Sequence, residues 1–139
     1  MDLELTGKRA IVTGGSRGIG KAIARELALE GVDVVIAARD KPTLDETASE
    51  LAAETKRSII PIVVDTTKWD DVQNMVDSTV AALGGVDILV NSAAMVGGQV
   101  RGTLSEATEK DLIEDLDTKV VGYFRCIKAV VPHMQSNKW

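Results

Sequence analysis

The chain has 139 residues, of which 45% are apolar and 27% are charged, and its formal net charge at pH 7 is −5. This length and apolar content predict one soluble globular domain and exclude a mainly disordered chain. The acidic balance argues against a nucleic-acid-binding protein, and no apolar run approaches the ~18 residues that a membrane-spanning helix needs. The acidic first residues are unlike a signal peptide, and the single cysteine, Cys126, favours a reducing compartment, so we expect a cytoplasmic protein.

Four short apolar runs, rich in β-branched residues, alternate with helix-length stretches along the chain. Each run is too short for a typical helix and is bounded by Gly, Pro or charged residues, which predicts a buried strand. Because aromatic residues are few and aliphatic residues are many, we expect helices to bury both faces of these strands. The predicted strands span residues 9–13, 32–38, 59–64 and 86–90.

Between the predicted strands, apolar residues recur every three or four positions, which is the spacing of an amphipathic helix. We expect Gly31 to end the first helix and Pro42 to open the second. The third helix is expected to begin at Thr67, with Asp70 as its capping partner, and to end at a Gly-Gly pair. The last and longest helix is expected over about residues 108–134.

The alternation of strand and helix predicts an α/β fold with a doubly wound parallel sheet of the Rossmann type. Parallel strands need right-handed helical crossovers, and four of them give the strand order 3-2-1-4, which is the N-terminal half of such a sheet. We therefore expect residues 1–139 to form a single domain of this type that stops before a fifth strand. Ligands bind at the carboxyl ends of the strands in this fold, where the glycine-rich segment over residues 95–103 is also expected.

The most informative motif directly follows the first predicted strand and reads Thr-Gly-Gly-Ser-Arg-Gly-Ile-Gly over residues 13–20. Gly14 permits a tight turn, Gly18 lets a diphosphate approach the backbone, and Gly20 lets the next helix pack against the strand. The free N–H groups and the dipole at the start of that helix both favour an anion. The motif therefore predicts a diphosphate-binding loop, although its spacing differs from the more widespread Gly-x-Gly-x-x-Gly.

The end of the second predicted strand indicates which dinucleotide would bind. An acid at this position would bond the ribose 2′-hydroxyl of NAD, but the chain has Ala38 followed by Arg39. Arg39, helped by Arg17, would instead bind a 2′-phosphate, so we expect NADP rather than NAD. An ordinary solvated arginine would explain Arg39 as well. Three alternatives stay open for Asp40, which can cap the next helix, pair with Arg39 or reach the ribose itself.

Taken together, these motifs resemble the short-chain dehydrogenase/reductase family, and the resemblance extends over the whole chain. In that family the pattern over residues 13–20 is the cofactor loop, and an aspartate matching Asp65 bonds the adenine edge. Asn-Ser-Ala-Ala over residues 91–94 matches the family's Asn-Asn-Ala-Gly after the fourth strand, with small residues at both departures. The resemblance implies that Asn91 steadies the sheet beside the cofactor and that Ala93 leaves room for a ribose.

The residues that we expect to bind the cofactor come from four loops at the carboxyl ends of the strands. They are Gly14, Ser16, Arg17, Gly18, Ile19, Gly20, Arg39, Asp65, Thr66, Asn91, Ser92 and Ala93.

The resemblance implies an oxidoreductase that transfers hydride between NADP and a carbonyl or secondary alcohol substrate. The family's catalysis uses a serine after the fifth strand and a Tyr-x-x-x-Lys on the next helix. No residue here matches them, so we expect this chain to carry the dinucleotide-binding half and to be inactive alone. The only tyrosine, Tyr123, is expected in packing or at an interface. Lys119 replaces an asparagine of the family's proton relay, and its role stays open.

Two alternatives to an oxidoreductase remain. One is a non-catalytic nucleotide-binding module, or a truncated product, that acts through a partner chain. The other is a methyltransferase-like α/β fold, which would need an acid where Ala38 and Arg39 lie. We expect no metal, nucleic acid or membrane as partner, but either a second copy of the chain or the missing C-terminal portion, because the fourth strand would otherwise be an exposed edge.

Overall fold

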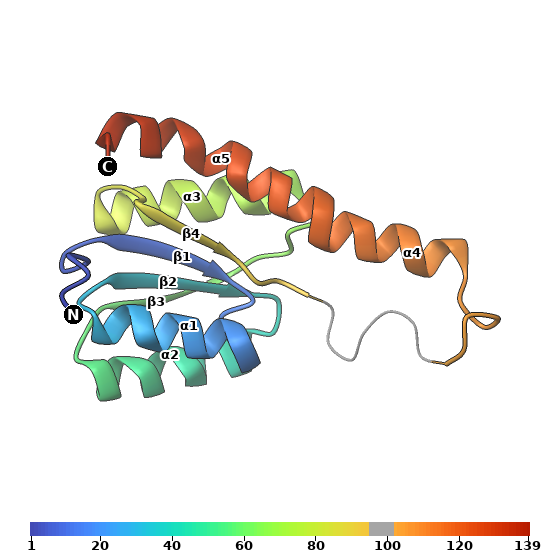
Figure 1. Cartoon of the computed structure of the whole chain (residues 1–139), viewed down its shortest axis with the longest axis horizontal. Coiled ribbons are helices and arrows are strands. Elements are labelled where there is room, and N and C mark those ends of the chain that lie inside the picture. The colour runs from blue at the N-terminus through green and yellow to red at the C-terminus, as the bar shows by residue number, and fades with distance from the viewer. Residues whose placement is uncertain (95–101) are drawn as a thin grey trace.

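A parallel four-stranded sheet forms the centre of the computed structural model (Figure 1). The structure describes residues 1–94 and 102–139, so most of the predicted glycine-rich segment lies outside the described residues. The strands pair in the order β3-β2-β1-β4, as the sequence predicts. The strands are β1 (Arg9–Thr13), β2 (Asp33–Ala38), β3 (Ile59–Val63) and β4 (Ile88–Asn91).

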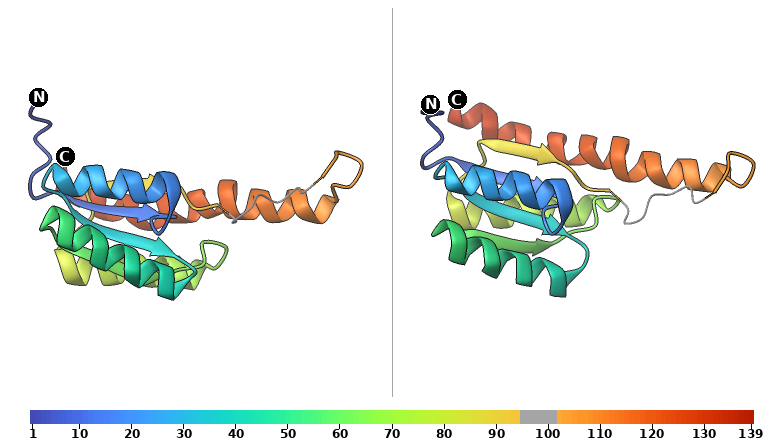
Figure 2. Two further views of the ribbon diagram at one scale, coloured as in Figure 1. Left: turned by 90° about the horizontal axis from the view of Figure 1, so that it is seen from below. Right: turned by 60° about the horizontal axis from the view of Figure 1, so that its bottom comes forward.

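Helices cover both faces of the sheet (Figures 1 and 2). The helical segments are α1 (Gly18–Leu29), α2 (Lys41–Thr55), α3 (Trp69–Leu83), α4 (Glu109–Leu116), the π-helical turn η1 (Asp117–Val121) and α5 (Gly122–Asn137). Alternate residues of a strand point to opposite faces, so Ile11 of β1 packs under α3 and α5, whereas Ala10 and Val12 pack under α1 and α2. Within the described part of the chain, no helix is long and apolar enough to cross a membrane.

Local signals set most helix boundaries as expected. Gly31 follows the end of α1 with a φ of +88°, and Gly84 ends α3 with a φ of +84°, a backbone conformation that glycine adopts readily. Pro42 lies in the first turn of α2, where its missing N–H costs no hydrogen bond.

The predicted cap of the third helix is wrong. α3 begins at Trp69, and Lys68 is its N-cap without a side-chain cap. The Thr67 hydroxyl donates instead to Oδ1 of Asp65 at 2.7 Å, and the Thr67 N–H donates to the same atom at 3.0 Å. Asp65 lies two residues before Thr67, in the turn after β3, and its carboxylate accepts the hydrogen bond from the hydroxyl that the prediction assigned to the helix cap.

The sequence pattern predicts one regular C-terminal helix, but the middle of this helix contains a π-helical turn, which is wider than an α-helix. α4, η1 and α5 follow one another without a break, and η1 is a single π-helical turn. A capping box begins α4: the Thr108 hydroxyl accepts from the Asp111 N–H at 3.2 Å, and the Asp111 carboxylate accepts from the Thr108 N–H at 2.9 Å. Figure 1 shows α4 extending beyond the sheet, so that η1 lies near the carboxyl ends of the strands.

Candidate functional site

A pocket of about 520 Å³ opens at the carboxyl ends of the strands. The loop after β1, the end of β2, the segments after β3 and β4, and Thr118 of η1 form its walls. Of the twelve residues that the sequence predicts, all except Asn91 line this pocket. The folded chain therefore brings four separate loops to one concave surface, which is where α/β sheets bind ligands.

The glycine loop needs its glycines for two different reasons. A Cβ on Gly14 would overlap the Ser92 carbonyl oxygen, and a Cβ on Gly20 would overlap the Gly14 carbonyl oxygen. These two positions therefore allow close approach of backbone to backbone. Gly18 has a φ of +52° and no atom within 4 Å of where its Cβ would lie, so it leaves open space beside the pocket.

The start of α1 faces this open space. Arg17 is the N-cap, and no side chain caps the helix there. The first N–H groups of a helix have no intrahelical acceptor, and the helix dipole adds positive potential at the same end. The loop therefore offers an anion-binding surface of the type that holds phosphates.

Two arginines line the adjoining side of the pocket. Nη2 of Arg17 donates to Oδ2 of Asp40 at 2.7 Å and to the Thr43 hydroxyl at 3.0 Å. The Thr43 hydroxyl donates to the same Asp40 oxygen at 2.7 Å. The bond from Thr43, together with the charge of Arg17, holds the pKa of the Asp40 carboxyl below its ordinary value.

Two of the three roles that the sequence leaves open for Asp40 are not found in the structure. Asp40 makes no side-chain cap on α2, and it pairs with Arg17 rather than with Arg39. Arg39 is exposed at the pocket wall, and the ion pairs found within residues 1–94 and 102–139 do not include it.

The turn after β3 holds a carboxylate at the pocket wall. Burial acts to raise the pKa of the Asp65 carboxyl, but the two bonds from Thr67 and the charges of Lys68 and Arg39 outweigh it and lower that pKa. The Asp65 N–H in turn donates to Oδ2 of Asp71 at 3.0 Å. Asp65 is therefore an ionised and oriented acceptor at the pocket.

The segment after β4 is held from both sides. The Thr13 hydroxyl oxygen accepts from the N–H groups of Ser92 at 3.2 Å and Ala93 at 3.3 Å. The Tyr123 hydroxyl donates to the Ala93 carbonyl at 2.9 Å. Asn91 lies beside Thr13 in the β1–β4 pairing, and its buried Oδ1 has no hydrogen-bond partner among the described residues.

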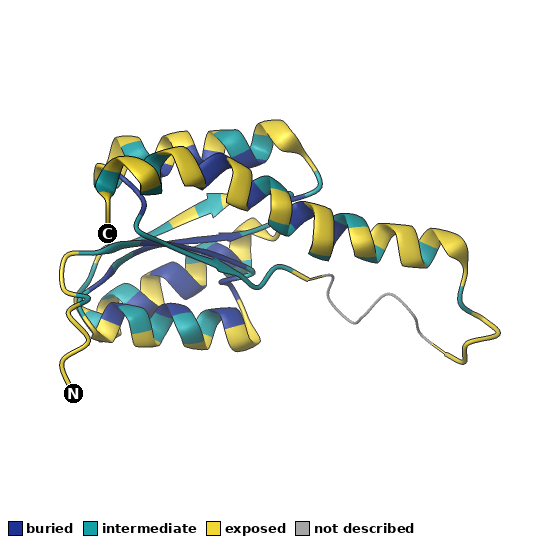
Figure 3. Ribbon diagram, turned by 45° about the horizontal axis from the view of Figure 1, so that its top comes forward, coloured by how far each residue is buried: buried dark blue, intermediate teal, exposed yellow. Residues whose placement is uncertain are grey.

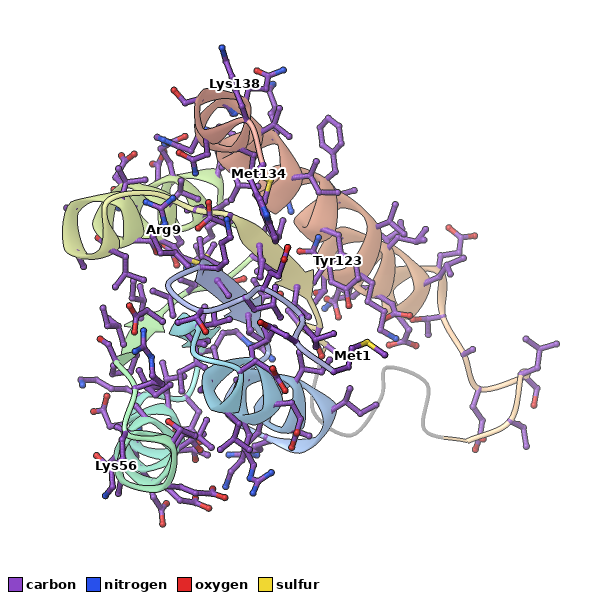
Figure 4. The ribbon with its side chains drawn as sticks, turned by 60° about the vertical axis from the view of Figure 1, so that its left-hand side comes forward. Met1, Arg9, Lys56, Tyr123, Met134 and Lys138 are labelled. Carbon is purple, nitrogen blue, oxygen red and sulfur yellow. The ribbon has the colours of Figure 1, made fainter. Side chains whose placement is uncertain are left out.

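Sequence reasoning did not foresee three of these features. Thr118 lines the pocket from the π-helical turn, and it is buried. Tyr123, which Figure 4 labels beside β4, has a defined partner in the pocket wall rather than a packing role alone. Lys119 pairs with Asp115 at 3.2 Å and does not line the pocket. A long helix carries no local signal for a π-helical turn or for the partner of a tyrosine hydroxyl.

Comparisons with known proteins agree with this geometry. The family model described as short chain dehydrogenase matches residues 8–139. Hydroxysteroid dehydrogenase-like protein 2 of Bos taurus is 35% identical over 142 residues, which cover 97% of this chain and 33% of that protein.

Solved structures give the same result for the fold. The L-sorbose reductase of Gluconobacter frateurii, complexed with NADPH and L-sorbose, is 34% identical with a TM-score of 0.90, over 99% of this chain and 51% of that one. An NAD⁺-bound xylitol dehydrogenase is 28% identical with a TM-score of 0.89, over 98% of this chain and 51% of that one. The chain spans a third to about half of the length of these proteins.

Proposed function

The chain belongs to the short-chain dehydrogenase family, and from this premise we propose that it is the dinucleotide-binding part of an NADP-dependent oxidoreductase. The complete protein would transfer hydride between the nicotinamide and a carbonyl or secondary alcohol substrate. The observation that carries the proposal is the pocket itself, in which a glycine loop and a helix start meet the ends of the other strands. The reductase complexed with NADPH supports the choice of cofactor.

Each wall of the pocket offers chemistry that suits one part of a dinucleotide. The free N–H groups at the start of α1, beside Gly18, suit the diphosphate. The ionised Asp65 suits a hydrogen-bond donor such as the adenine amino group. The small residues Ser92 and Ala93 leave room for a ribose. When bound, the nicotinamide supplies or accepts the hydride, and the residues of this chain hold the cofactor in place.

The preference for NADP rests on Arg39. This side chain lies at the pocket with no carboxylate paired to it in the described part of the chain, whereas Arg17 is already bound to Asp40. A guanidinium that is free to turn can bind a 2′-phosphate through two parallel hydrogen bonds. The fold alone does not decide the cofactor, because one similar structure contains NADPH and another contains NAD⁺.

We also propose that the long C-terminal helix contacts a second chain. Large apolar side chains are exposed along it, and Figure 3 shows exposed positions on its outer side. Exposed apolar patches of this kind mark interfaces more often than free surface. The apolar residues concerned are Leu112, Ile113, Leu116, Val120, Phe124 and Ile127.

The experiment that tests the proposed function is a calorimetric titration of the 139-residue chain with NADPH and, separately, with NADH, which gives the Kd of each. We expect NADPH to bind about tenfold more tightly than NADH. Gly18→Ala should weaken binding of both, because a methyl group would stand beside the diphosphate. Gly7→Ala is the matched control, since Gly7 also has a positive φ and open space around it but lies outside the pocket. Equal affinity for the two cofactors would contradict the NADP assignment, and no binding of either would contradict the function.

A further inference from the structure

Two side chains from the first turn of α5 bond to backbone carbonyl groups on two different pocket walls. The Tyr123 hydroxyl donates to the Ala93 carbonyl at 2.9 Å, and Nη1 of Arg125 donates to the Thr66 carbonyl at 3.0 Å. Ala93 follows β4 and Thr66 follows β3, and both residues line the pocket. The two strands are the opposite edges of the described sheet, so no direct strand pairing sets the separation of these walls.

Arg125 is itself held in place by the π-helical turn. Its Nη2 donates to Oδ1 of Asp117 at 2.7 Å, and its Nη1 also donates to the Asp117 carbonyl at 3.3 Å. Its side chain is only 19% exposed. The guanidinium therefore fixes three acceptors at once, which a planar fork of donors does well and a single ammonium does not.

The start of α5 also packs closely against the pocket wall after β3. A Cβ on Gly122 would lie 3.0 Å from the Thr66 hydroxyl, which is tighter than an ordinary contact, so glycine favours this close approach. Thr118, one helical turn earlier, is buried and lines the pocket. η1 and the Thr66 segment thus form one continuous wall, and Arg125 bonds the two parts together.

Tyr123 completes the fixation of the opposite wall. The Ser92 and Ala93 N–H groups are bonded to Thr13 on the sheet side, and the Ala93 carbonyl is bonded to Tyr123 on the helix side. Removal of the phenolic hydroxyl would leave this carbonyl without its donor, and the peptide would then be held on one side only.

We propose that Tyr123 and Arg125 are positioning residues that set the separation of the pocket walls after β3 and β4, and thereby the affinity for the dinucleotide. This proposal rests on the function proposed above. It differs from a purely structural role, in which the same bonds would hold the helix on the sheet and leave ligand affinity unchanged.

The test compares Tyr123→Phe with a control that loses the same kind of bond elsewhere. Thr79→Val removes a hydroxyl that donates to the Met75 carbonyl at 2.8 Å inside α3, away from the pocket. The measurements are the Kd for NADPH, the Tm of the free chain and hydrogen exchange of single amides. We expect Tyr123→Phe to raise the Kd about 5-fold and to speed exchange at the Ser92 and Ala93 amides by a similar factor. The control should lower the Tm and leave both other measurements as in the wild type.

Arg125→Lys is the second variant, because it keeps the charge and loses the fork. It should also weaken NADPH binding, but its effect on exchange should fall on the turn after β3. The Thr67 and Lys68 amides report there, since they donate within that turn to the carboxylate and the carbonyl of Asp65. Faster exchange at these amides, with Ser92 unchanged, would show that each side chain holds its own wall.

The result that overturns the proposal is wild-type NADPH affinity in both variants, or loss of affinity that Thr79→Val reproduces. Failure of the proposed function gives a different pattern, in which the wild-type chain binds no dinucleotide at all. In that case hydrogen exchange of the two variants tests the positioning role. Faster exchange confined to the two pocket walls supports this role, and exchange equal to that of the wild type overturns it.

Discussion

The guanidinium of Arg17 and the carboxylate of Asp40 form an ion pair at 2.7 Å on the wall of the candidate cofactor pocket. The pocket therefore contains its own anion next to one of the two arginines that the proposed 2′-phosphate would use. Both side chains are about half exposed, at 51% and 48%, so the pair is weak enough for a ligand to displace. Asp40 then competes with the cofactor for Arg17.

Asp40→Asn should accordingly strengthen NADPH binding by about 2- to 5-fold and leave NADH binding unchanged, because only NADPH carries the extra phosphate. The gain should shrink as salt is added. Asp45→Asn is the control, since it breaks a similar exposed pair with Lys41 outside this pocket. Calorimetric titrations at low and high salt measure the effect, and weaker NADPH binding in Asp40→Asn would mean that Asp40 orients Arg17 for the ligand instead.

Arg39→Ala should lower the affinity for NADPH about tenfold and bring it close to that for NADH, because a charge-assisted bidentate contact is lost. The affinity of this variant for NADH should equal that of the wild type. The comparison variant is Arg57→Ala, which removes an arginine paired with Asp33 and outside the pocket. If both cofactors weaken equally in Arg39→Ala, the side chain has a general role in the pocket and not a role in cofactor choice.

Gly20→Ala should destabilise the fold more than Gly7→Ala does. The new methyl group on Gly20 would overlap the Gly14 carbonyl, whereas the one on Gly7 meets no atom within 4 Å. Overpacking of this kind costs about 1–3 kcal/mol in the free energy of unfolding. Urea denaturation of the two variants gives the comparison. Equal midpoints would show that the turn relaxes around the added methyl group.

Self-association through the long helix is the next expectation. Phe124 is 61% exposed and Ile127 is 46% exposed on it, and a lysine at either position should weaken a contact with a second copy. Leu29→Lys on α1 is the control, because Leu29 is 49% exposed on another surface. Sedimentation velocity would show the change in mass. A wild-type chain that stays monomeric at high concentration would contradict this interface.

The sequence predicts those parts of the fold that depend on short segments. A β-branched run, a glycine after a helix and a glycine loop between strand and helix each act within a few residues, so Gly31 and the loop over residues 13–20 are found where expected. Once the strands are parallel, right-handed crossovers leave few orders to choose from. The pocket-lining residues follow, because the carboxyl ends of all strands meet at one edge of the sheet.

The remaining features depend on competition between distant groups. Two carboxylates, those of Asp65 and Asp70, lie within three residues of Thr67 in the sequence. Only the folded turn shows that the Thr67 hydroxyl bonds to Asp65. Arg17 and Asp40 are 23 residues apart, and Tyr123 and Ala93 are 30 residues apart, so no local pattern pairs them. Such contacts are chosen by packing after the backbone is in place, which is why the sequence motifs identify the pocket but not the bonds that hold its walls.

At the amino ends of the strands, Arg9 and Asp87 form an ion pair that should dominate the response of the fold to acid. Nε of Arg9 donates to Oδ2 of Asp87 at 2.8 Å, and the Asp87 side chain is only 3% exposed. Asn137 donates to Oδ1 of the same carboxylate at 3.0 Å. The bonds from Arg9, which outweigh the cost of burial, hold the pKa of the Asp87 carboxyl below its ordinary value.

A carboxyl whose pKa is lowered in the folded state stabilises the fold above its unfolded pKa, near 4, and loses that contribution as the pH falls through the lower folded value. Asp87→Asn should therefore cost about 2–4 kcal/mol in the free energy of unfolding at pH 7, because it leaves Arg9 without its charge partner. The difference between wild type and variant should narrow only below about pH 4, where Asp87 of the unfolded chain binds a proton while the folded carboxyl, with its lower pKa, does not yet do so. Urea denaturation at pH 7, 5 and 3 measures this difference. A gap that stays constant down to pH 3 would show that the cost comes from altered packing and not from the lost charge.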